Sequence, residues 1–183
     1  MKKITLALGF AFLSVFAYAH NLQINAILPN VAVQKEGELI LNGKEISYKN
    51  WQSSDLTGKV RVIQHLAGRS SVKEKNEALM EAIKAQHFSP AVYQTTTIIN
   101  ADDAIFGTSS FVKSSAEKGK KQFPHSQIIL DQTGQVKNAW QLQPQESLIV
   151  VLDKNGKVRF ANEGKLSAQQ IEQVIELVGE LVK

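Results

Sequence analysis

The sequence contains no cysteine among its 183 residues. This absence excludes thiol–disulfide exchange, a cysteine nucleophile, and zinc or iron–sulfur sites built on cysteine ligands, because each of them needs the cysteine sulfur. Disulfide bonds are excluded as well, although they are common in exported proteins. The chemistry open to this chain is therefore that of its oxygen and nitrogen groups.

Long apolar runs are also scarce, and the only one lies at the N-terminus. Residues 4–16 are mostly apolar and follow two lysines, but they are too few to span a membrane comfortably, since a spanning helix needs about 20 apolar residues. Ala17 and Ala19 then supply the small residues that a signal peptidase recognises. We predict a signal peptide over residues 1–19, cleavage after Ala19, export to the periplasm, and no stable membrane insertion afterwards.

A large excess of charge is missing too. The chain has 21 Lys and Arg and 17 Asp and Glu, a formal net charge of +4, and removal of the leader with its two lysines lowers this to +2. Such a balance gives no reason to expect a nucleic-acid partner or an anionic membrane. The one basic cluster, Lys118, Lys120 and Lys121 beside Phe123, is interpreted as a solvated surface.

What the sequence does contain is a regular succession of strand and helix patterns. Alternating apolar residues over 38–49 predict a β-hairpin with a two-residue turn at Asn42-Gly43. Further strands are expected over 60–66, 95–99, 127–130, 148–152 and 157–160, and helices over 72–87, 108–122 and 135–142. Ser167, with Gln170 three residues later, predicts the capping box of a final helix. These elements fit one α/β domain over residues 20–183, with the hairpin as an N-terminal extension.

The order of the elements resembles that of thioredoxin-like domains, which are three-layer α/β sandwiches. The segments that carry this resemblance are "KVRVIQHLAG", "FPHSQIILDQTGQVKNAWQL" and "SLIVVLDKNGKVRFANEGKLSAQQIEQVIELV". The first resembles the strand that leads into the active-site loop of exported thiol–disulfide proteins. The other two resemble the insertion and the closing hairpin and helix of the same domains.

A more specific resemblance is to the YtfJ-type family of small exported bacterial proteins. It rests on "GKVRVIQHLAGRSS", "EAIKA", "YQTTTIINADDAI", "VKSS" and "VVLDKNGKV", which together span most of the chain. The resemblance implies a thioredoxin-like fold and a periplasmic location, and it implies no assigned reaction.

Two departures from redox thioredoxins bear on activity. The resemblance places Ser70 and Lys73 roughly where the two active cysteines would lie, and neither residue can form a disulfide. The position that a cis-proline normally takes falls near Ser147, because Pro144 lies too early in the chain. We therefore expect the fold without the redox activity.

The loop Gly68-Arg69-Ser70-Ser71 joins an expected strand to an expected helix. One interpretation is structural, with Ser71 as the N-cap and Glu74 as its reciprocal partner in a capping box. The other interpretation is an anion site, in which free backbone N–H groups, the helix dipole and Arg69 converge on a carboxylate or a phosphate. The sequence leaves both interpretations open.

Asp102 and Asp103 follow the expected strand over 95–99. In open α/β sheets ligands bind beyond the carboxyl ends of the strands, so we expect these aspartates to share an edge of the sheet with residues 67–71. They either bind a divalent cation or form a solvated turn in which one of them pairs with Arg69.

An enzyme of another class is the alternative to a binding protein. Ser70 and Lys73 have the spacing of a serine–lysine dyad, and His65 is a second candidate base for Ser70. Asp102 and Asp103 are the other candidates for such hydrolase-like chemistry. Any of these roles requires the side chains to converge in one pocket.

Metal handling is a minor alternative. Cleavage after Ala19 would make His20 the terminal residue, whose amine and imidazole could chelate copper. The four histidines show no spacing typical of a metal site, so neither a bound metal nor another cofactor is expected.

The favoured hypothesis is a non-redox, thioredoxin-like periplasmic module that binds a protein, a peptide or a small anion. Its ligand is expected at the edge formed by residues 67–71 and 100–106. The candidate ligand-binding residues are Gly68, Arg69, Ser70, Ser71, Asp102 and Asp103.

Overall fold

The structure is a computed structural model that describes residues 20–183, so the predicted signal peptide lies outside the described residues. The strands are β1 (Ala32–Asn42), β2 (Glu45–Gln52), β3 (Val60–Ala67), β4 (Tyr93–Asn100), β5 (Gln127–Asp131), β6 (Ser147–Leu152) and β7 (Val158–Glu163). The helices are the 3-10 helix η1 (Ser53–Leu56) and α1 (Ser70–Glu74), α2 (Glu77–Ala85), α3 (Ser109–Gln122), α4 (Gln135–Trp140) and α5 (Ala168–Leu181).

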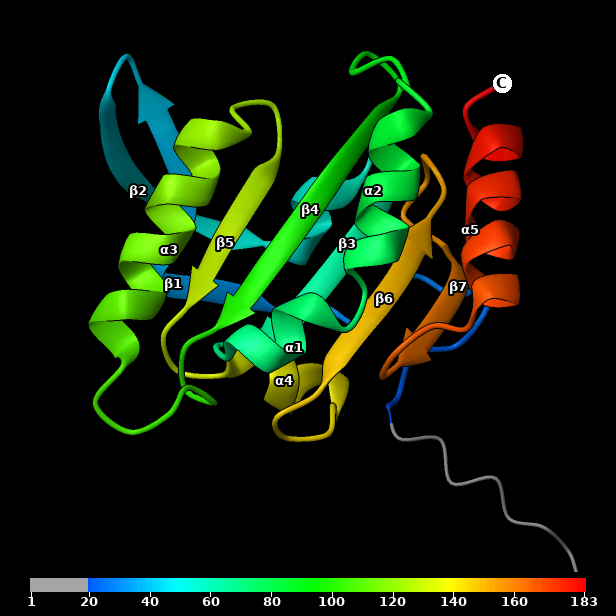
Figure 1. The fold of residues 1–183 in the computed structure, drawn as a ribbon. Coiled ribbons are helices and arrows are strands. Elements are labelled where there is room, and N and C mark those ends of the chain that lie inside the picture. The colour runs from blue at the N-terminus through cyan, green and yellow to red at the C-terminus, as the bar shows by residue number, and fades with distance from the viewer. Residues whose placement is uncertain (1–19) are drawn as a thin grey trace, which may run out of the picture.

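The strands form one sheet in the order β2-β1-β5-β4-β3-β6-β7 (Figure 1). β4 pairs in parallel with both β3 and β5, and the remaining pairs are antiparallel. Every residue of β3 and of β6 is buried, because these neighbouring strands lie in the interior of the sheet and are covered on both faces. The predicted α/β class with an N-terminal hairpin extension is confirmed.

Helices cover both faces of this sheet and make it the middle of three layers. α1, α2, α3 and α5 lie over one face, as Figure 1 shows, and α2 and α5 pack there on β3, β6 and β7. On the other face, α4 and η1 bury Trp140 and Leu56 together with Leu22 and Leu28 of the segment that precedes β1. Among residues 20–183, no helix is both long and apolar enough to cross a membrane.

The N-terminal hairpin is part of the sheet, because β1 pairs with β5 as well as with β2. Its turn differs by one residue from the prediction. Asn42 pairs with Glu45, so the two-residue loop is Gly43-Lys44, and only Gly43 has a positive φ, of 63°. Glycine supplies that backbone conformation without strain, and it does so at the first loop position.

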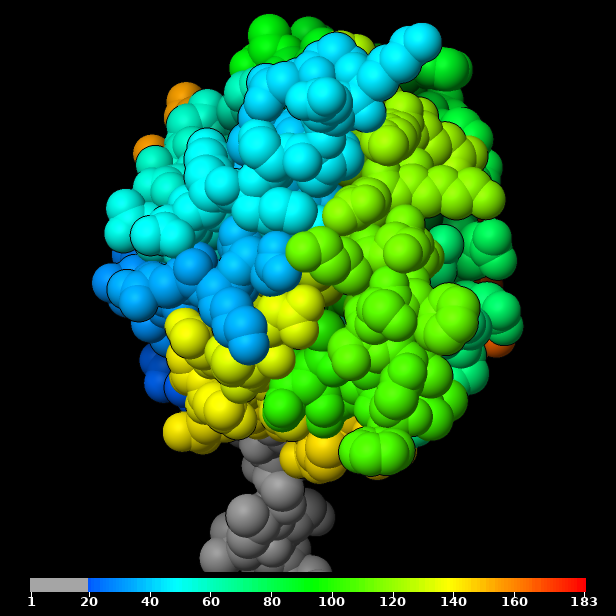
Figure 2. Space-filling model, turned by 90° about the vertical axis from the view of Figure 1, so that its left-hand side faces the viewer, coloured from blue at the N-terminus to red at the C-terminus, as the bar shows by residue number. Residues whose placement is uncertain are grey.

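Side-chain contacts fasten the hairpin to α3. The Tyr48 hydroxyl donates a hydrogen bond of 2.7 Å to Glu117, and the Lys113 ammonium lies 2.9 Å from a carboxylate oxygen of Glu36. The same ammonium sits 4.6 Å from the centre of the Tyr48 ring, a cation–π contact. Figure 2 shows the hairpin and α3 side by side on this face of the molecule.

The predicted helix over 72–87 was wrong as one element, because it is divided into α1 and α2 at Asn76. The Asn76 side chain is buried and has three partners at the start of β6 and in the segment before α5. Its Nδ2 donates to Ser147 Oγ at 3.1 Å and to the Gly164 carbonyl at 3.0 Å, and its Oδ1 accepts the Leu166 N–H at 2.9 Å. These long-range bonds hold α1 and α2 as separate helices.

The basic cluster on α3 is not uniformly solvated, which corrects the prediction for Lys120. This side chain is buried, and its ammonium donates to the carbonyls of Pro124 and Ser126 at 2.9 Å and 2.7 Å. Burial lowers the pKa of Lys120 from its usual value. Lys118 and Lys121 are exposed, as expected.

Replacement of the amide at the helix break tests its structural role. Asn76→Ala leaves the buried Leu166 N–H without a partner, and we expect the free energy of unfolding to fall by about 2–4 kcal/mol in urea denaturation. Asn138→Ala is the matched control, since Asn138 is exposed on α4, and we expect it to change the free energy of unfolding by less than about 0.5 kcal/mol. Equal effects of the two substitutions would contradict the assignment.

Candidate functional site

The loop after β3 passes close to two other segments, and this explains its glycine. The Gly68 N–H donates to the Asn100 carbonyl at 2.8 Å, which ties the loop to the end of β4. A Cβ atom at Gly68 would lie 3.1 Å from that carbonyl oxygen and 3.2 Å from side-chain carbons of Ala104 and Val112. A larger residue would push these segments apart, so glycine keeps β3, β4 and α3 together at this edge.

The predicted capping role of Ser71 was wrong. α1 begins at Ser70, its N-cap residue is Arg69, and no side chain caps it. Both serines are exposed. The Arg69 side chain reaches across to the loop after β4, where its Nε donates to the Asp103 carbonyl at 2.8 Å. Arg69 therefore binds the main chain of Asp103. The predicted ion pair between Arg69 and an aspartate carboxylate is not formed among the described residues.

The Asp103 carboxylate is directed toward α4 and the loop that follows it. Lys137 Nζ lies 2.8 Å from Oδ1, and the Gln145 N–H donates to Oδ2 at 3.1 Å. Partial burial of Asp103 opposes its ionisation, but these hydrogen bonds outweigh it and hold the pKa of the carboxyl below its usual value. The more exposed Asp102 carboxylate lies 3.7 Å from the same ammonium.

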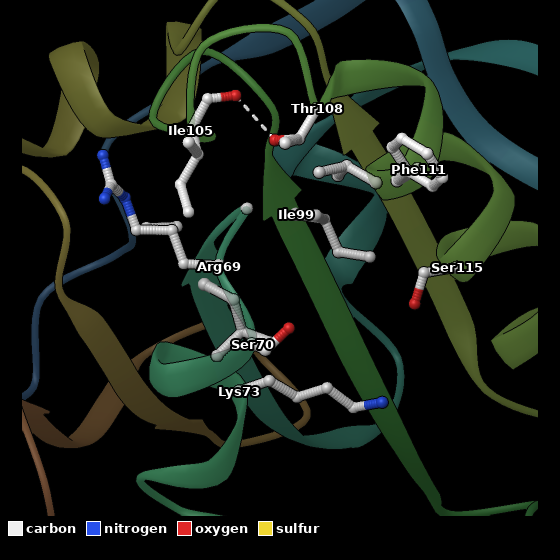
Figure 3. Close-up of a pocket in the computed structure, with 12 residues that line it drawn as sticks. Arg69, Ser70, Lys73, Ile99, Ile105, Thr108, Phe111 and Ser115 are labelled. Carbon is white, nitrogen blue, oxygen red and sulfur yellow. Dashed lines mark hydrogen bonds between the residues drawn. The ribbon is translucent and has the colours of Figure 1, made fainter.

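A cavity of about 350 Å³ lies between the loop after β3, α1 and α3 (Figure 3). Its lining residues come from the end of β3, the loop, α1, β4, the segment that leads into α3, and α3 itself. They are Leu66, Ala67, Gly68, Arg69, Ser70, Lys73, Ile99, Ile105, Thr108, Phe111, Val112 and Ser115. Of the predicted site residues, Gly68, Arg69 and Ser70 line the cavity, whereas Ser71, Asp102 and Asp103 do not.

The walls of the cavity are mainly apolar, and its charged groups have one sign. Arg69 and Lys73 are the two charged lining residues, and no carboxylate is among the twelve. Figure 3 shows the Arg69 guanidinium pointing away from the centre, while Lys73 runs along the lower edge toward the side on which Ser115 lies. Thr108 Oγ1 donates to the Ile105 carbonyl at 2.6 Å and so closes the turn above the cavity.

His65 lies on the opposite face of the sheet from this cavity. It precedes Leu66 on β3, and neighbouring strand residues point to opposite faces. His65 is 2% exposed, and its buried Nε2 has no hydrogen-bond partner within the described residues 20–183. Burial lowers the pKa of His65 to about 4, although the charge of Asp103 opposes this shift. The imidazole is therefore neutral at neutral pH.

The structure brings Ser70 and Lys73 to one cavity and keeps the other candidate catalytic groups, His65, Asp102 and Asp103, away from it. Ser70 lines the cavity, whereas His65 is buried beneath the other face, so they do not form a nucleophile and base pair. Lys73 is exposed, and within residues 20–183 the hydrogen bond that it forms is from its backbone N–H to the Arg69 carbonyl, not to Ser70. Lys137 holds both aspartates outside the cavity. Ser70 and Lys73 thus share the cavity without a hydrogen bond among the described residues, and His65, Asp102 and Asp103 do not join them there.

His20 directly precedes Asn21, which is hydrogen-bonded to the end of α4. The Asn21 N–H donates to the Trp140 carbonyl at 3.1 Å, and Asn21 Nδ2 donates to the Ala139 carbonyl at 3.0 Å. In the part of the chain that the structure describes, no group of three or more His, Asp or Glu side chains is placed to hold a metal ion.

Sequence reasoning missed the α3 side of the cavity. Phe111, Val112 and Ser115 fall in a stretch that its lysines made look like a solvated helix, whereas Ile105 lies within the predicted edge 100–106. One pattern in the sequence could have indicated how this helix packs. Val112, Ala116 and Lys120 are spaced four residues apart, and they form the stripe of α3 that faces the sheet. Phe111 lies outside that stripe, so its exposure could have been anticipated.

Comparison with known proteins gives close relatives over the full length of the chain. A family model described as "Bacterial protein of unknown function (YtfJ_HI0045)" matches residues 22–181. An uncharacterized protein of Haemophilus influenzae is 55% identical over 185 residues, which cover 100% of both chains. The uncharacterized protein YtfJ of Escherichia coli K12 is 46% identical over 183 residues, covering 100% of this chain and 99% of that protein.

Solved structures with this fold are more distant in sequence. One from Chlorobium tepidum, whose description names a thiol:disulfide interchange protein, has a TM-score of 0.61 at 17% identity and covers 89% of this chain and 100% of that one. The thioredoxin domain of a thiol-disulfide oxidoreductase from Bacteroides vulgatus has a TM-score of 0.53 at 14% identity, covering 86% of this chain and 98% of that one. At these identities the likeness shows the fold alone, which is thioredoxin-like as expected.

Burial of a neutral histidine makes stability depend on pH. The unfolded chain binds a proton at His65 below about pH 6.5 and the folded chain only below about pH 4, so the free energy of unfolding falls as the pH is lowered through this window. Between about pH 7 and pH 5 we expect His65 to contribute a loss of about 2 kcal/mol, measured by urea denaturation.

His65→Gln should remove this part of the pH dependence, whatever its effect on stability at neutral pH. The control is His125→Gln, because His125 is exposed and should leave the dependence in place. Asp103 and Glu146, whose pKa values are lowered, lose their contribution mainly below about pH 5, as their carboxylates become protonated. An unchanged slope in His65→Gln would contradict the assignment.

Proposed function

We propose that this chain, which belongs to the YtfJ_HI0045 family of bacterial proteins, is a non-redox binding protein that holds a ligand non-covalently in the cavity between α1 and α3. Its location is proposed to be the periplasm, on the strength of the predicted signal peptide at residues 1–19. The ligand is proposed to have an apolar part that the cavity walls cover.

The observation that carries this proposal is the exposure of large apolar side chains around the cavity. Ile105 and Phe111 line it and are 58% and 74% exposed. Exposed apolar side chains that gather around a concave site are typical of a surface that a ligand covers. The volume of about 350 Å³ falls within the range of small-molecule sites in proteins.

The absence of cysteine supports binding over thiol chemistry. Solved structures with the same fold carry names such as thiol:disulfide interchange protein, and that activity needs cysteine sulfur. This chain has none, and Ser70 begins the helix that follows β3. A scaffold of this fold still offers a surface at the end of β3, and binding there needs no reactive group.

A neutral fluorescent probe tests the proposal. N-phenylnaphthylamine becomes bright in apolar surroundings, and we expect residues 20–183 to bind it in the cavity. Ser115→Trp places a large ring among the lining residues and should weaken probe binding about tenfold, which corresponds to about 1.4 kcal/mol. Fluorescence titration gives the dissociation constants.

The matched control is Ser114→Trp. Ser114 is the neighbouring exposed serine of α3 and does not line the cavity, so the probe should bind this variant as it binds the original chain. Thermal unfolding of both variants shows whether they remain folded. Absence of probe binding, or equal binding by both variants, would overturn the proposal.

A further inference from the structure

The charges around the cavity favour one kind of polar group on the ligand. Lys73 and Arg69 border the cavity, and no acidic residue does. Lys75, two residues beyond Lys73, is paired with Glu146, whereas among residues 20–183 no carboxylate lies within ion-pair distance of the Lys73 ammonium. An anionic group at this edge would meet an unpaired cation and no repelling charge.

Figure 3 places the Lys73 ammonium at one edge of the apolar walls and not in their middle. Ile99 lies between this edge and the turn formed by Ile105 and Thr108, and the Ser70 and Ser115 hydroxyls lie near the same side as Lys73. The site is therefore polar at one end and apolar along its length. A molecule that fits it carries its charge at one end and an apolar chain behind it.

The backbone of the walls argues against an extended peptide. Most main-chain N–H groups beside the cavity already donate within the protein, namely those of Ala67, Gly68, Arg69, Lys73, Thr108, Phe111 and Val112. A peptide buried here would find few free N–H donors for its own carbonyl groups, at a cost of about 1–3 kcal/mol for each unpaired group. An alkyl chain has no hydrogen-bonding group to satisfy, so these walls suit it better.

We infer that the ligand class of this cavity is a free fatty acid, with the alkyl chain against Ile99, Ile105 and Phe111 and the carboxylate at the Lys73 ammonium. This inference rests on the proposed function and narrows it from an apolar ligand to an alkyl monocarboxylate. Binding is non-covalent, and it covers apolar side chains that the protein otherwise exposes.

Competition with N-phenylnaphthylamine measures the two parts of the ligand separately. Across hexanoate, octanoate and decanoate, all below their micelle-forming concentrations, affinity should rise about fourfold for each added methylene until the cavity is filled. At one chain length, octanoate should bind about two- to fivefold more tightly than octanol, and octylamine should bind most weakly. The preference for octanoate should decrease as salt is added.

Lys73→Gln should abolish the preference for octanoate over octanol while leaving the gain per methylene intact. Lys118→Gln is the matched control, since it removes one positive charge from an exposed lysine of α3 that does not line the cavity, and it should keep the preference. Phe111→Ser should reduce the gain per methylene, and Phe106→Ser should not, because only Phe111 lines the cavity.

The outcomes separate this inference from the proposed function. Equal binding of octanoate and octylamine, no effect of Lys73→Gln, or tighter binding of an apolar tetrapeptide than of decanoate would overturn the fatty-acid assignment. The proposed function would still stand if the probe bound the original chain and bound the Ser115→Trp variant more weakly. Failure of the probe to bind at all would overturn both.

Discussion

The buried amide of Asn76 fixes the geometry on which the cavity depends. A buried amide is costly unless its donors and acceptor are satisfied, and here the partners are Ser147, Gly164 and Leu166. To form all three hydrogen bonds, Asn76 interrupts the helical stretch after β3, so that α1 is a separate short helix. Lys73 and Ser70 are carried by α1, and their positions at the cavity edge follow from this break.

The carboxyl edge of the sheet separates charged groups from apolar ones. On the α4 side, Lys137 engages both aspartates, and His65 lies buried near them. On the other side, the cavity is bordered by apolar residues and by Arg69 and Lys73. Because the aspartates are held by Lys137, their negative charge is kept out of the cavity. The cavity is therefore cationic because Lys137 pairs with the two aspartates on the α4 side of this edge of the sheet.

Local patterns in the sequence predicted most of the fold and less of the site. The strands and the Ser167–Gln170 capping box follow from periodicity and from residues close together in the chain, and the structure confirms them. The break at Asn76 could not be read in this way, since its partners lie 71, 88 and 90 residues away. The cavity joins α1 to α3, so it too depends on tertiary contacts. Gly68, Arg69 and Ser70 were identified because a loop at a strand end is a local feature.

The exposed apolar residues and Lys73, which has no carboxylate partner among residues 20–183, make a stronger argument together than apart. Scattered apolar side chains are normal on protein surfaces, and an exposed lysine is ordinary as well. Here Ile105 and Phe111 border the same cavity as Lys73, at the edge where β3 ends in a loop held by Gly68. A ligand that covers the apolar walls removes them from water, and a carboxylate at its end meets the cation in partly desolvated surroundings, where the attraction is stronger. The two contributions reinforce each other only in a molecule that carries both groups, and for that reason the chemistry of the walls favours an amphipathic acid over a purely apolar or purely anionic ligand.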